Sequence, residues 1–222
     1  LALEDGKYYE GESFGAEGEI EGEVVFNTSM TGYQEILTDP SYKGQMVTMT
    51  YPLIGNYGVN PKDIESDRVQ VSAFLIKEYQ GFPSNYRSTE TLADYLRRQK
   101  TLGIEALDTR AITRHIRNTG AMRAFVSTKD LDPSSLIMRA KQIPSMEGQN
   151  LAKKVTTKIP YYWKNGEPEF FDCKTSDLNQ NLFKRRQDKK SVVAFDFGIK
   201  YNILRCLESQ GFEVIVVPSS TT

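Results

Sequence analysis

At 222 residues, the chain is long enough for one large domain, or for one domain and part of a second. Hydrophobic residues make up 39% of it and charged residues 26%, a composition that can fill a core and that excludes a disordered chain. The formal net charge of −1 provides no basic excess of the kind that binds nucleic acid or an anionic membrane.

The sequence also bears on the cellular compartment. No run approaches the ~18–20 uninterrupted apolar residues that a membrane span needs. The start, Leu1-Ala2-Leu3-Glu4-Asp5-Gly6, lacks the basic residues and the apolar core of a signal peptide. The two cysteines, Cys173 and Cys206, are far apart and do not have metal-ligand spacing. We therefore expect a cytoplasmic protein without a membrane segment, a disulfide framework or a metal site.

The first elements carry strand signals. Asp5-Gly6 is a two-residue hairpin signal, and it predicts pairing of residues 1–4 with residues 7–14. Alternation of Val47 and Met49 with threonines predicts a strand over 45–51. Apolar runs predict further strands at 23–26 and 69–76.

Helix signals follow. Ser88 and Thr89 are possible caps before a first helix, and Asp108 and Asp132-Pro133 mark the starts of two more. Gly120 stands where a helix commonly ends. The apolar sets at helical spacing are Leu92, Tyr95 and Leu96; Ala111, Ile112, His115 and Ile116; and Leu136, Ile137 and Ala140.

After these helices the periodic pattern stops. Prolines, glycine and asparagines interrupt residues 156–190, which end in the charged run 183–190. We interpret this segment as a linker between a first domain, 1–155, and a second one.

Residues 191–222 have a different pattern. An apolar strand at 191–195 is followed by the turn Asp196-Phe197-Gly198, a helix at 199–210 and a second apolar strand at 212–217. Strands with almost no polar residues, joined through a helix, are typical of a parallel βαβ unit. One such unit is too small for a domain, so we predict that it begins a larger parallel sheet.

No nucleophile and base are predicted within the chain. His115 is the sole histidine. Cys206 shares helical spacing with Ile203 and Leu207, which predicts a core position. Cys173 lies in the predicted linker without the glycines of a nucleophile elbow. A Cys–His dyad is therefore not expected here.

Two basic features remain open to two interpretations. Arg110, Arg114 and Arg117 recur at i, i+4 and i+7, and form either a partner or anion contact or a solvated helix face. Lys200 begins the helix after a parallel strand, where α/β proteins place ligand-binding groups and where the helix dipole disfavours a cation. A purely structural role fits both features as well.

The segment 27–42 is dense in hydroxyl and amide side chains and lacks strand or helix periodicity over most of its length. It predicts a hydrogen-bonded loop with a short helix at 33–37. Such a loop either holds a polar substrate or satisfies its own backbone groups, and the residues do not distinguish the two.

This segment, Asn27-Thr28-Ser29-Met30-Thr31-Gly32-Tyr33-Gln34-Glu35-Ile36-Leu37-Thr38-Asp39-Pro40-Ser41-Tyr42, resembles a signature of the carbamoyl-phosphate synthetase small-subunit family. The resemblance continues in the family's order through Gly44-Gln45 and the blocks at 51–58, 108–110, 150–152 and 192–205. It therefore extends over essentially the whole chain.

The resemblance implies the glutamine-hydrolysing subunit of an enzyme that makes carbamoyl phosphate from bicarbonate, glutamine and ATP for pyrimidine and arginine synthesis. It implies an α+β N-terminal domain of the layered β/β/α swivelling type, followed by the first βαβ unit of a flavodoxin-like class I glutamine amidotransferase domain. The implied partners are glutamine and the large subunit, which binds ATP and Mg²⁺. No cofactor is expected on this chain.

The resemblance also assigns site residues. Ser41 matches a serine that contacts glutamine, and Met30 and Lys200 match positions along the path of ammonia. No catalytic residue is expected here, because the family's Cys-His-Glu triad matches none of Cys173, Cys206 and His115 and would lie after Thr222. An alternative is a non-catalytic module that docks on the large subunit.

Overall fold

The computed structural model describes residues 1–170 and 190–221 and has a mixed α/β fold. It divides the chain into two compact units, Leu1–Gln149 and Asn150–Thr222. The first contains a seven-stranded and a two-stranded sheet, and the second contains a four-stranded sheet.

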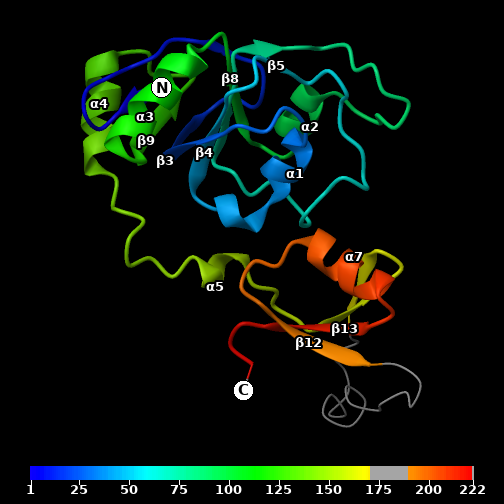
Figure 1. Cartoon of the computed structure of the whole chain (residues 1–222). Helices are drawn as coiled ribbons and strands as arrows, with labels where there is room; N and C mark the ends of the chain where they lie inside the picture. Colours follow the sequence, from blue (N-terminus) through cyan, green and yellow to red (C-terminus); the bar gives the residue numbers. More distant parts are fainter. Residues whose placement is uncertain (171–189, 222) are drawn as a thin grey trace. The chain divides into compact units, whose positions relative to one another are not determined.

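The seven-stranded sheet is mixed and curved (Figure 1). Its order is β1-β9-β3-β4-β6-β8-β2, in which the central strands β3, β4, β6 and β8 are parallel and the remaining neighbours are antiparallel. The two-stranded sheet pairs β5 with β7 in parallel. The bounds are β1 Ala2–Leu3, β2 Glu12–Ser13, β3 Glu19–Asn27, β4 Gln45–Met49, β5 Leu53–Ile54, β6 Ala73–Leu75, β7 Glu78–Tyr79, β8 Leu102–Glu105 and β9 Met122–Ser127.

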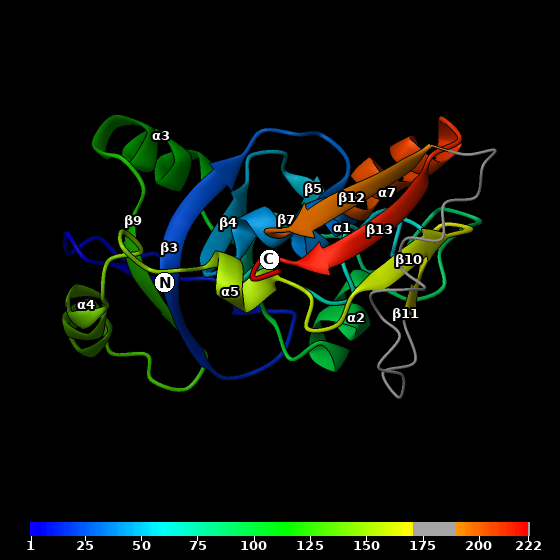
Figure 2. The same ribbon diagram turned by 90° about the horizontal axis from the view of Figure 1, so that it is seen from below.

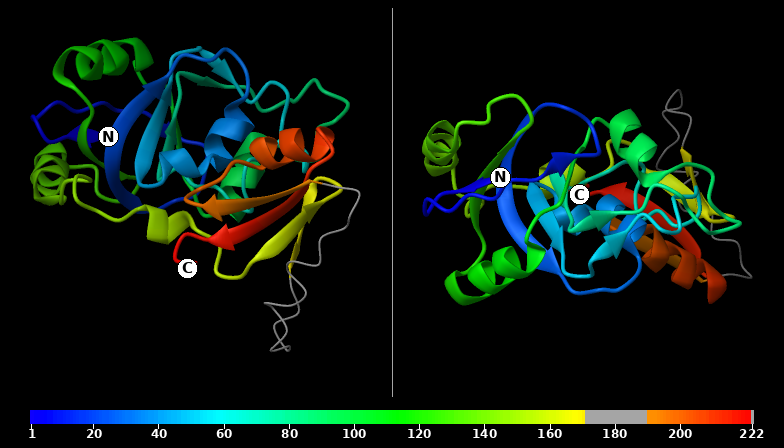
Figure 3. Two further views of the ribbon diagram at one scale, coloured as in Figure 1. Left: turned by 60° about the horizontal axis from the view of Figure 1, so that its bottom comes forward. Right: turned by 90° about the horizontal axis from the view of Figure 1, so that it is seen from above.

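Helices cover both faces of this sheet. One hydrophobic cluster joins α1 (Tyr33–Thr38) and α2 (Leu92–Arg98) to one face, and a second joins α3 (Thr109–Thr119) to the other. Figure 1 shows the strands between these two sets of helices. A third cluster places α4 (Pro133–Gln142) against β1 and β9, on the opposite side of β9 from α3 (Figure 3).

The caps of α3 and α4 confirm the sequence signals. The Asp108 carboxylate accepts a hydrogen bond of 2.9 Å from the backbone N–H of Ala111, and Asp132 accepts bonds from Ser134 and Ser135 at 3.1 and 3.3 Å. Gly120 ends α3 at φ 94°, a conformation that favours glycine. The cap of α2 is Thr91 rather than Ser88 or Thr89.

The predicted N-terminal hairpin forms between residues 1–3 and residues 7–9, and Leu1 and Tyr9 exchange two backbone hydrogen bonds at its open end. Leu3 N–H donates to the carbonyl of Lys7 at 2.8 Å, and Ala2 bridges Tyr8. The main partner of β1 is β9, however, and β2 pairs with β8. A local turn signal does not report these partners, which are more than 90 positions away in the sequence for either strand.

The second unit has the predicted strand–helix–strand unit. β12 (Ser191–Asp196) and β13 (Glu213–Pro218) are parallel, and α7 (Tyr201–Ser209) connects them. The sheet order is β11-β10-β13-β12, so β12 lies at an edge of the described sheet (Figure 2). The core contains Trp163, Leu204, Val214 and Val216.

The structure differs from the predicted linker over 156–190. Its first part forms a hairpin of β10 (Tyr161–Lys164) and β11 (Glu167–Phe170), preceded by the short helix α5 (Ala152–Val155). Asn165 and Gly166, both at positive φ, make the turn. On its other side, β10 pairs with β13 in antiparallel orientation. Residues 171–189 of the predicted linker lie outside the described residues.

The second unit exposes apolar residues on β12, and the prediction that Cys206 is buried is wrong. Val193 and Phe195 on β12 are 42% and 48% exposed, because β12 is an edge strand with one described neighbour. Cys206 is exposed as well, because α7 turns Leu204 rather than Cys206 into the core. Both sides of α7 carry apolar residues at helical spacing. Which side is buried depends on how the helix packs on the sheet.

Among the described residues, no helix is both long enough and apolar enough to cross a lipid bilayer.

Candidate functional site

The signature segment 27–42 begins where β3 ends. Asn27 accepts a hydrogen bond from Ser29 N–H at 2.8 Å, which turns the chain out of the sheet. Gly32 has φ 84° and leads into α1, whose six residues precede a single helical turn, η1 (Pro40–Tyr42), and then β4. The segment is therefore the crossover between two neighbouring parallel strands.

Tyr57 holds the start of α1. Its hydroxyl oxygen accepts hydrogen bonds from Gly32 N–H at 2.7 Å and from Tyr33 N–H at 2.9 Å. Its ring stacks on that of Tyr33 at 4.1 Å, and the Tyr33 hydroxyl donates to the carbonyl of Gly58 at 2.7 Å. Burial raises the pKa of Tyr57 to about 12 and raises the pKa of Tyr33 further, so both hydroxyls stay protonated at neutral pH.

Side chains fix the rest of α1. The buried amide of Gln34 donates to the carbonyl of Asn60 at 2.5 Å and accepts from Asn60 N–H at 2.9 Å. The Thr38 hydroxyl accepts from Glu65 N–H at 2.9 Å, and Ser66 donates to the Thr38 carbonyl at 2.6 Å. These polar residues of the signature satisfy backbone groups of the segment and of the loop that follows β5.

Ser41 lies on the short turn η1. The buried carboxylate of Asp39 accepts from Ser41 N–H at 2.9 Å, and Pro40 sets the first position of the turn. The Asn27 amide donates to the Tyr42 hydroxyl at 2.9 Å, which ties the end of β3 to the turn. The Ser41 side chain is exposed and has no hydrogen-bond partner among the described residues.

The exposed residues of the segment lie near its start, at 28–31, and at Ser41. Met30 is 70% exposed although it is a large apolar side chain. Thr28, Ser29, Thr31 and Ser41 are exposed hydroxyl-bearing residues. The buried polar groups of the segment therefore support the backbone, whereas these five residues are exposed at the surface.

Glu35 is the acidic group of α1. Burial raises the pKa of its carboxyl, and the carboxylates of Asp63 and Glu65 raise it further, while Arg87 lowers it. A carboxyl held closer to its neutral form is a common feature of functional sites. Neither its spacing nor its type identified Glu35 in the sequence.

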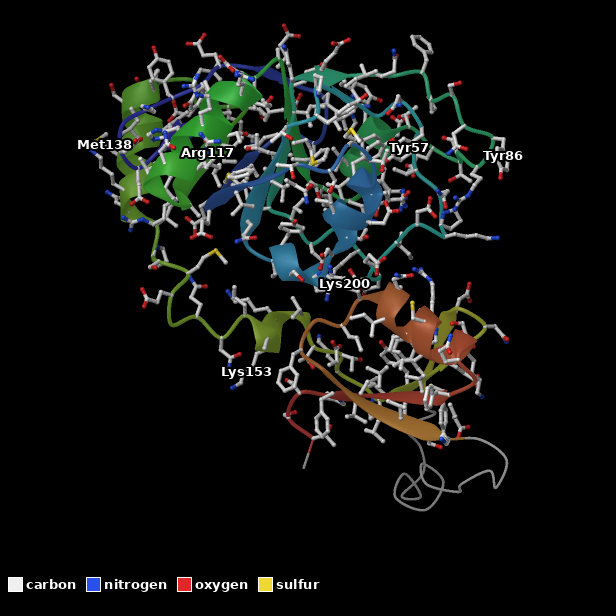
Figure 4. All side chains as sticks on the ribbon, viewed as in Figure 1. Tyr57, Tyr86, Arg117, Met138, Lys153 and Lys200 are labelled. Carbon is white, nitrogen blue, oxygen red and sulfur yellow. The ribbon has the colours of Figure 1, made fainter. Side chains whose placement is uncertain are left out.

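Lys200 lies in the second unit, directly before α7 (Figure 4). The preceding turn is built by Asp196, whose buried carboxylate accepts from Gly198 N–H and Ile199 N–H at 2.9 Å each and from Thr157 N–H at 2.5 Å. Asp196 therefore has a structural role, and it orders the turn that presents Lys200.

The other candidates for chemistry are accounted for differently. The two ring nitrogens of His115 contact Asp5 at 2.6 Å and Lys7 at 2.9 Å, so the ring joins α3 to the N-terminal turn. Cys206 is a free, exposed thiol, and Cys173 lies outside the described residues. Residues 1–170 and 190–221 contain no cluster of three or more metal-ligating side chains.

The sequence did not indicate that the side chains of Asn27 and Tyr57 hold the segment in place through hydrogen bonds. Tyr57 acts on Gly32 and Tyr33 across 24 or 25 positions, and Asn27 acts on Tyr42 across 15. The only signal in the sequence is that Tyr57 lies in a block that resembles the family.

Comparison with known proteins identifies the family. The family described as carbamoyl-phosphate synthase small chain, CPSase domain, matches residues 1–126. A protein of Syntrophotalea carbinolica named carbamoyl phosphate synthase small chain is 53% identical over 221 residues, covering 100% of this chain and 57% of the relative.

Proteins of the same name from other organisms are similar to nearly the same extent. That of Nitratidesulfovibrio vulgaris strain Hildenborough is 53% identical over 99% of this chain, and that of Aquifex aeolicus is 50% identical over 98%, with 57% of each relative covered. The chain thus spans a little more than half the length of these relatives. It belongs to the carbamoyl-phosphate synthase small-chain family.

Proposed function

We propose that the complete protein is the glutamine-hydrolysing subunit of a cytoplasmic carbamoyl-phosphate synthase of pyrimidine and arginine synthesis. It releases ammonia from glutamine and delivers it to a large subunit that uses bicarbonate, ATP and Mg²⁺. Membership of the small-chain family supports this proposal, because a small chain implies a large one.

One structural observation carries the assignment of a glutamine contact. Ser41 presents an exposed hydroxyl on a turn fixed from beneath by Asp39, Pro40 and the bond between Asn27 and Tyr42. A hydroxyl both donates and accepts hydrogen bonds, as the amide and the charged ends of glutamine require. A pre-ordered turn also reduces the entropy lost when the ligand binds.

Met30 and Lys200 are proposed to line the route of ammonia. Ammonia released into neutral water is mostly protonated and loses its nucleophilic lone pair, so an enclosed route preserves it. An apolar thioether such as Met30 keeps a route dry without binding ammonia tightly. A lysine side chain that lines the route repels the ammonium cation and so favours passage of the neutral form.

The fold of the complete protein is proposed to follow the family. The first unit corresponds to a layered β/β/α swivelling domain, and the second begins a flavodoxin-like class I amidotransferase domain. The parallel pair β12–β13 and the exposed apolar side chains of Val193 and Phe195 support a sheet that continues past β12. The cysteine, histidine and glutamate of catalysis would then come from sequence after this chain.

Glutaminase assays test the proposal directly. We expect the complete protein with its large subunit to form carbamoyl phosphate from glutamine, and the 222-residue chain alone to show no glutaminase activity. Turnover by the 222-residue chain that is abolished by Cys206→Ser would contradict the assignment of the catalytic cysteine. A complete protein that uses ammonia but never glutamine would contradict the proposed function.

A further inference from the structure

Helix α3 carries an unusual concentration of positive charge. It contains Arg110, Arg114 and Arg117 and has no Asp or Glu between Thr109 and Thr119. The three arginines are exposed and recur at i, i+4 and i+7, so they share one strip of the helix. The opposite side is buried through Ile112 and Ile116. Figure 4 labels Arg117 on this helix.

These three arginines differ from the other described arginines, because their side chains have no hydrogen-bond or ion-pair partner among the described residues. The carboxylate nearest to them in sequence belongs to Asp108, and it caps the helix by accepting a hydrogen bond from Ala111 N–H. The other described arginines form the pairs Arg68–Asp67, Arg87–Asp63, Arg97–Asp94, Arg98–Glu90, Arg123–Glu4 and Arg139–Glu19, and Arg205 also has a partner.

The arrangement does not favour the stability of α3 itself. Like charges at i,i+4 and i,i+3 repel each other along a helix. Arg110 also lies in the first turn, where the helix dipole disfavours a cation, whereas Arg117 lies in the last turn, where the dipole favours one. Three unpaired guanidinium groups in this arrangement are better explained by a partner than by a contribution to folding.

We propose that Arg110, Arg114 and Arg117 form a docking surface for a carboxylate-rich patch of the large subunit; the inference rests on the proposed function. Residues 110 to 117 span ~10 Å along the helix axis, a length that fits two or three carboxylates. Each planar guanidinium can hold a carboxylate through two parallel hydrogen bonds. Three cations on a chain of net charge −1 are too few for the long phosphate track of a nucleic acid.

The test compares three versions of the complete small subunit for affinity to the purified large subunit. The first is wild type, and the second carries Arg110→Gln, Arg114→Gln and Arg117→Gln. The third is a matched control that loses three exposed charges elsewhere, through Arg97→Gln, Lys129→Gln and Lys141→Gln. Sedimentation or interferometry measures each dissociation constant from low to high salt.

We expect the α3 variant to bind about 10- to 100-fold more weakly than wild type at low salt, with a smaller difference at high salt. The control is expected to bind like wild type. The thermal midpoint of the α3 variant should stay close to that of wild type, because the three substituted side chains are exposed, so a loss of binding would not reflect misfolding.

Each alternative result has a distinct meaning. Equal binding by wild type and the α3 variant at all salt concentrations, or equal weakening of the control, overturns the docking surface and leaves the proposed function intact. A wild-type protein that does not bind the large subunit overturns the proposed function and this inference with it. Salt-dependent binding of wild type to a 20-base-pair DNA, lost in the α3 variant, assigns the strip to nucleic acid and overturns the inference.

Discussion

At the scale of single residues, burial divides the signature into side chains that hydrogen-bond to the backbone and side chains that are exposed. Tyr33, Gln34 and Thr38 are buried and bind backbone groups, whereas Met30 and Ser41 are exposed. Hydroxyl and amide side chains can serve either purpose, and which one they serve depends on the groups that face them.

Ser41→Ala tests the proposed glutamine contact. In the complete enzyme we expect a 5- to 150-fold loss of kcat/KM for glutamine, corresponding to about 1–3 kcal/mol for a ligand group left without its partner. Carbamoyl phosphate formation from free ammonia should be unchanged, because ammonia bypasses the glutamine site. Ser134→Ala, at an exposed serine of α4, is the control. Equal losses with both nitrogen sources would show a defect of folding or assembly.

Tyr57→Phe tests the support of α1. It removes the acceptor of two backbone N–H groups and keeps the ring that stacks on Tyr33. We expect a loss of about 1–3 kcal/mol in the free energy of unfolding, measured by urea denaturation. Tyr86→Phe, at a side chain that is 97% exposed, should change the stability little. Equal effects of the two substitutions would contradict the role of the Tyr57 hydroxyl.

The same hydroxyl predicts sensitivity to alkali. Burial raises the pKa of Tyr57 to about 12, and that of Tyr95 likewise to about 12, from an ordinary value of 10.0. The unfolded chain therefore releases these protons first as the pH rises. Their contribution to stability is fully present below about pH 10 and is lost as the pH rises through about 12. Urea midpoints that do not fall between about pH 9 and about pH 11 would contradict this expectation.

At the scale of elements, local signals succeed where the interactions are local. Asp108, Asp132-Pro133 and Gly120 predict the ends of α3 and α4 because each cap acts within a few residues. The partners of β1 and β2 are not predicted, because pairing with β9 and β8 depends on how the whole sheet is assembled. The hairpin β10–β11 also escapes prediction, since Pro168 and the polar residues around it conceal the strand pattern.

Asp108→Ala tests the cap of the helix that carries the arginine strip. Loss of the hydrogen bond to Ala111 N–H should lower the free energy of unfolding by about 1 kcal/mol. Asp67→Ala is a suitable control, because Asp67 forms only an exposed ion pair with Arg68. Asp108→Asn should retain most of the stability, since asparagine is also a good cap. A stability of Asp108→Asn as low as that of Asp108→Ala would contradict the capping role.

At the scale of the whole molecule, the second unit exposes apolar side chains that its described residues do not cover. Val193 and Phe195 project from the edge strand β12, and Phe197 just after it is 63% exposed. An edge strand with exposed apolar side chains promotes association with other chains. These residues are apolar, and the described part of the chain leaves them exposed.

We therefore expect the 222-residue chain to self-associate in a concentration-dependent manner. Phe195→Lys should reduce the association seen by light scattering, because it removes an exposed apolar side chain from this surface. Ser191→Lys adds the same charge to an exposed polar position of the same strand and serves as the matched control. A 222-residue chain that stays monomeric at high concentration would show that this surface is covered within the chain itself.

The sequence by itself determined the family, the helix caps, the short helix of the signature and the parallel βαβ unit, because each depends on residues close together in the chain or on a shared block order. Tertiary structure alone decided the strand partners of β1 and β2, the exposure of Cys206 and Phe195, and the division of the signature into supporting and exposed residues. These outcomes depend on which distant surface covers each side chain, and hydrophobic spacing on one element fits more than one such surface.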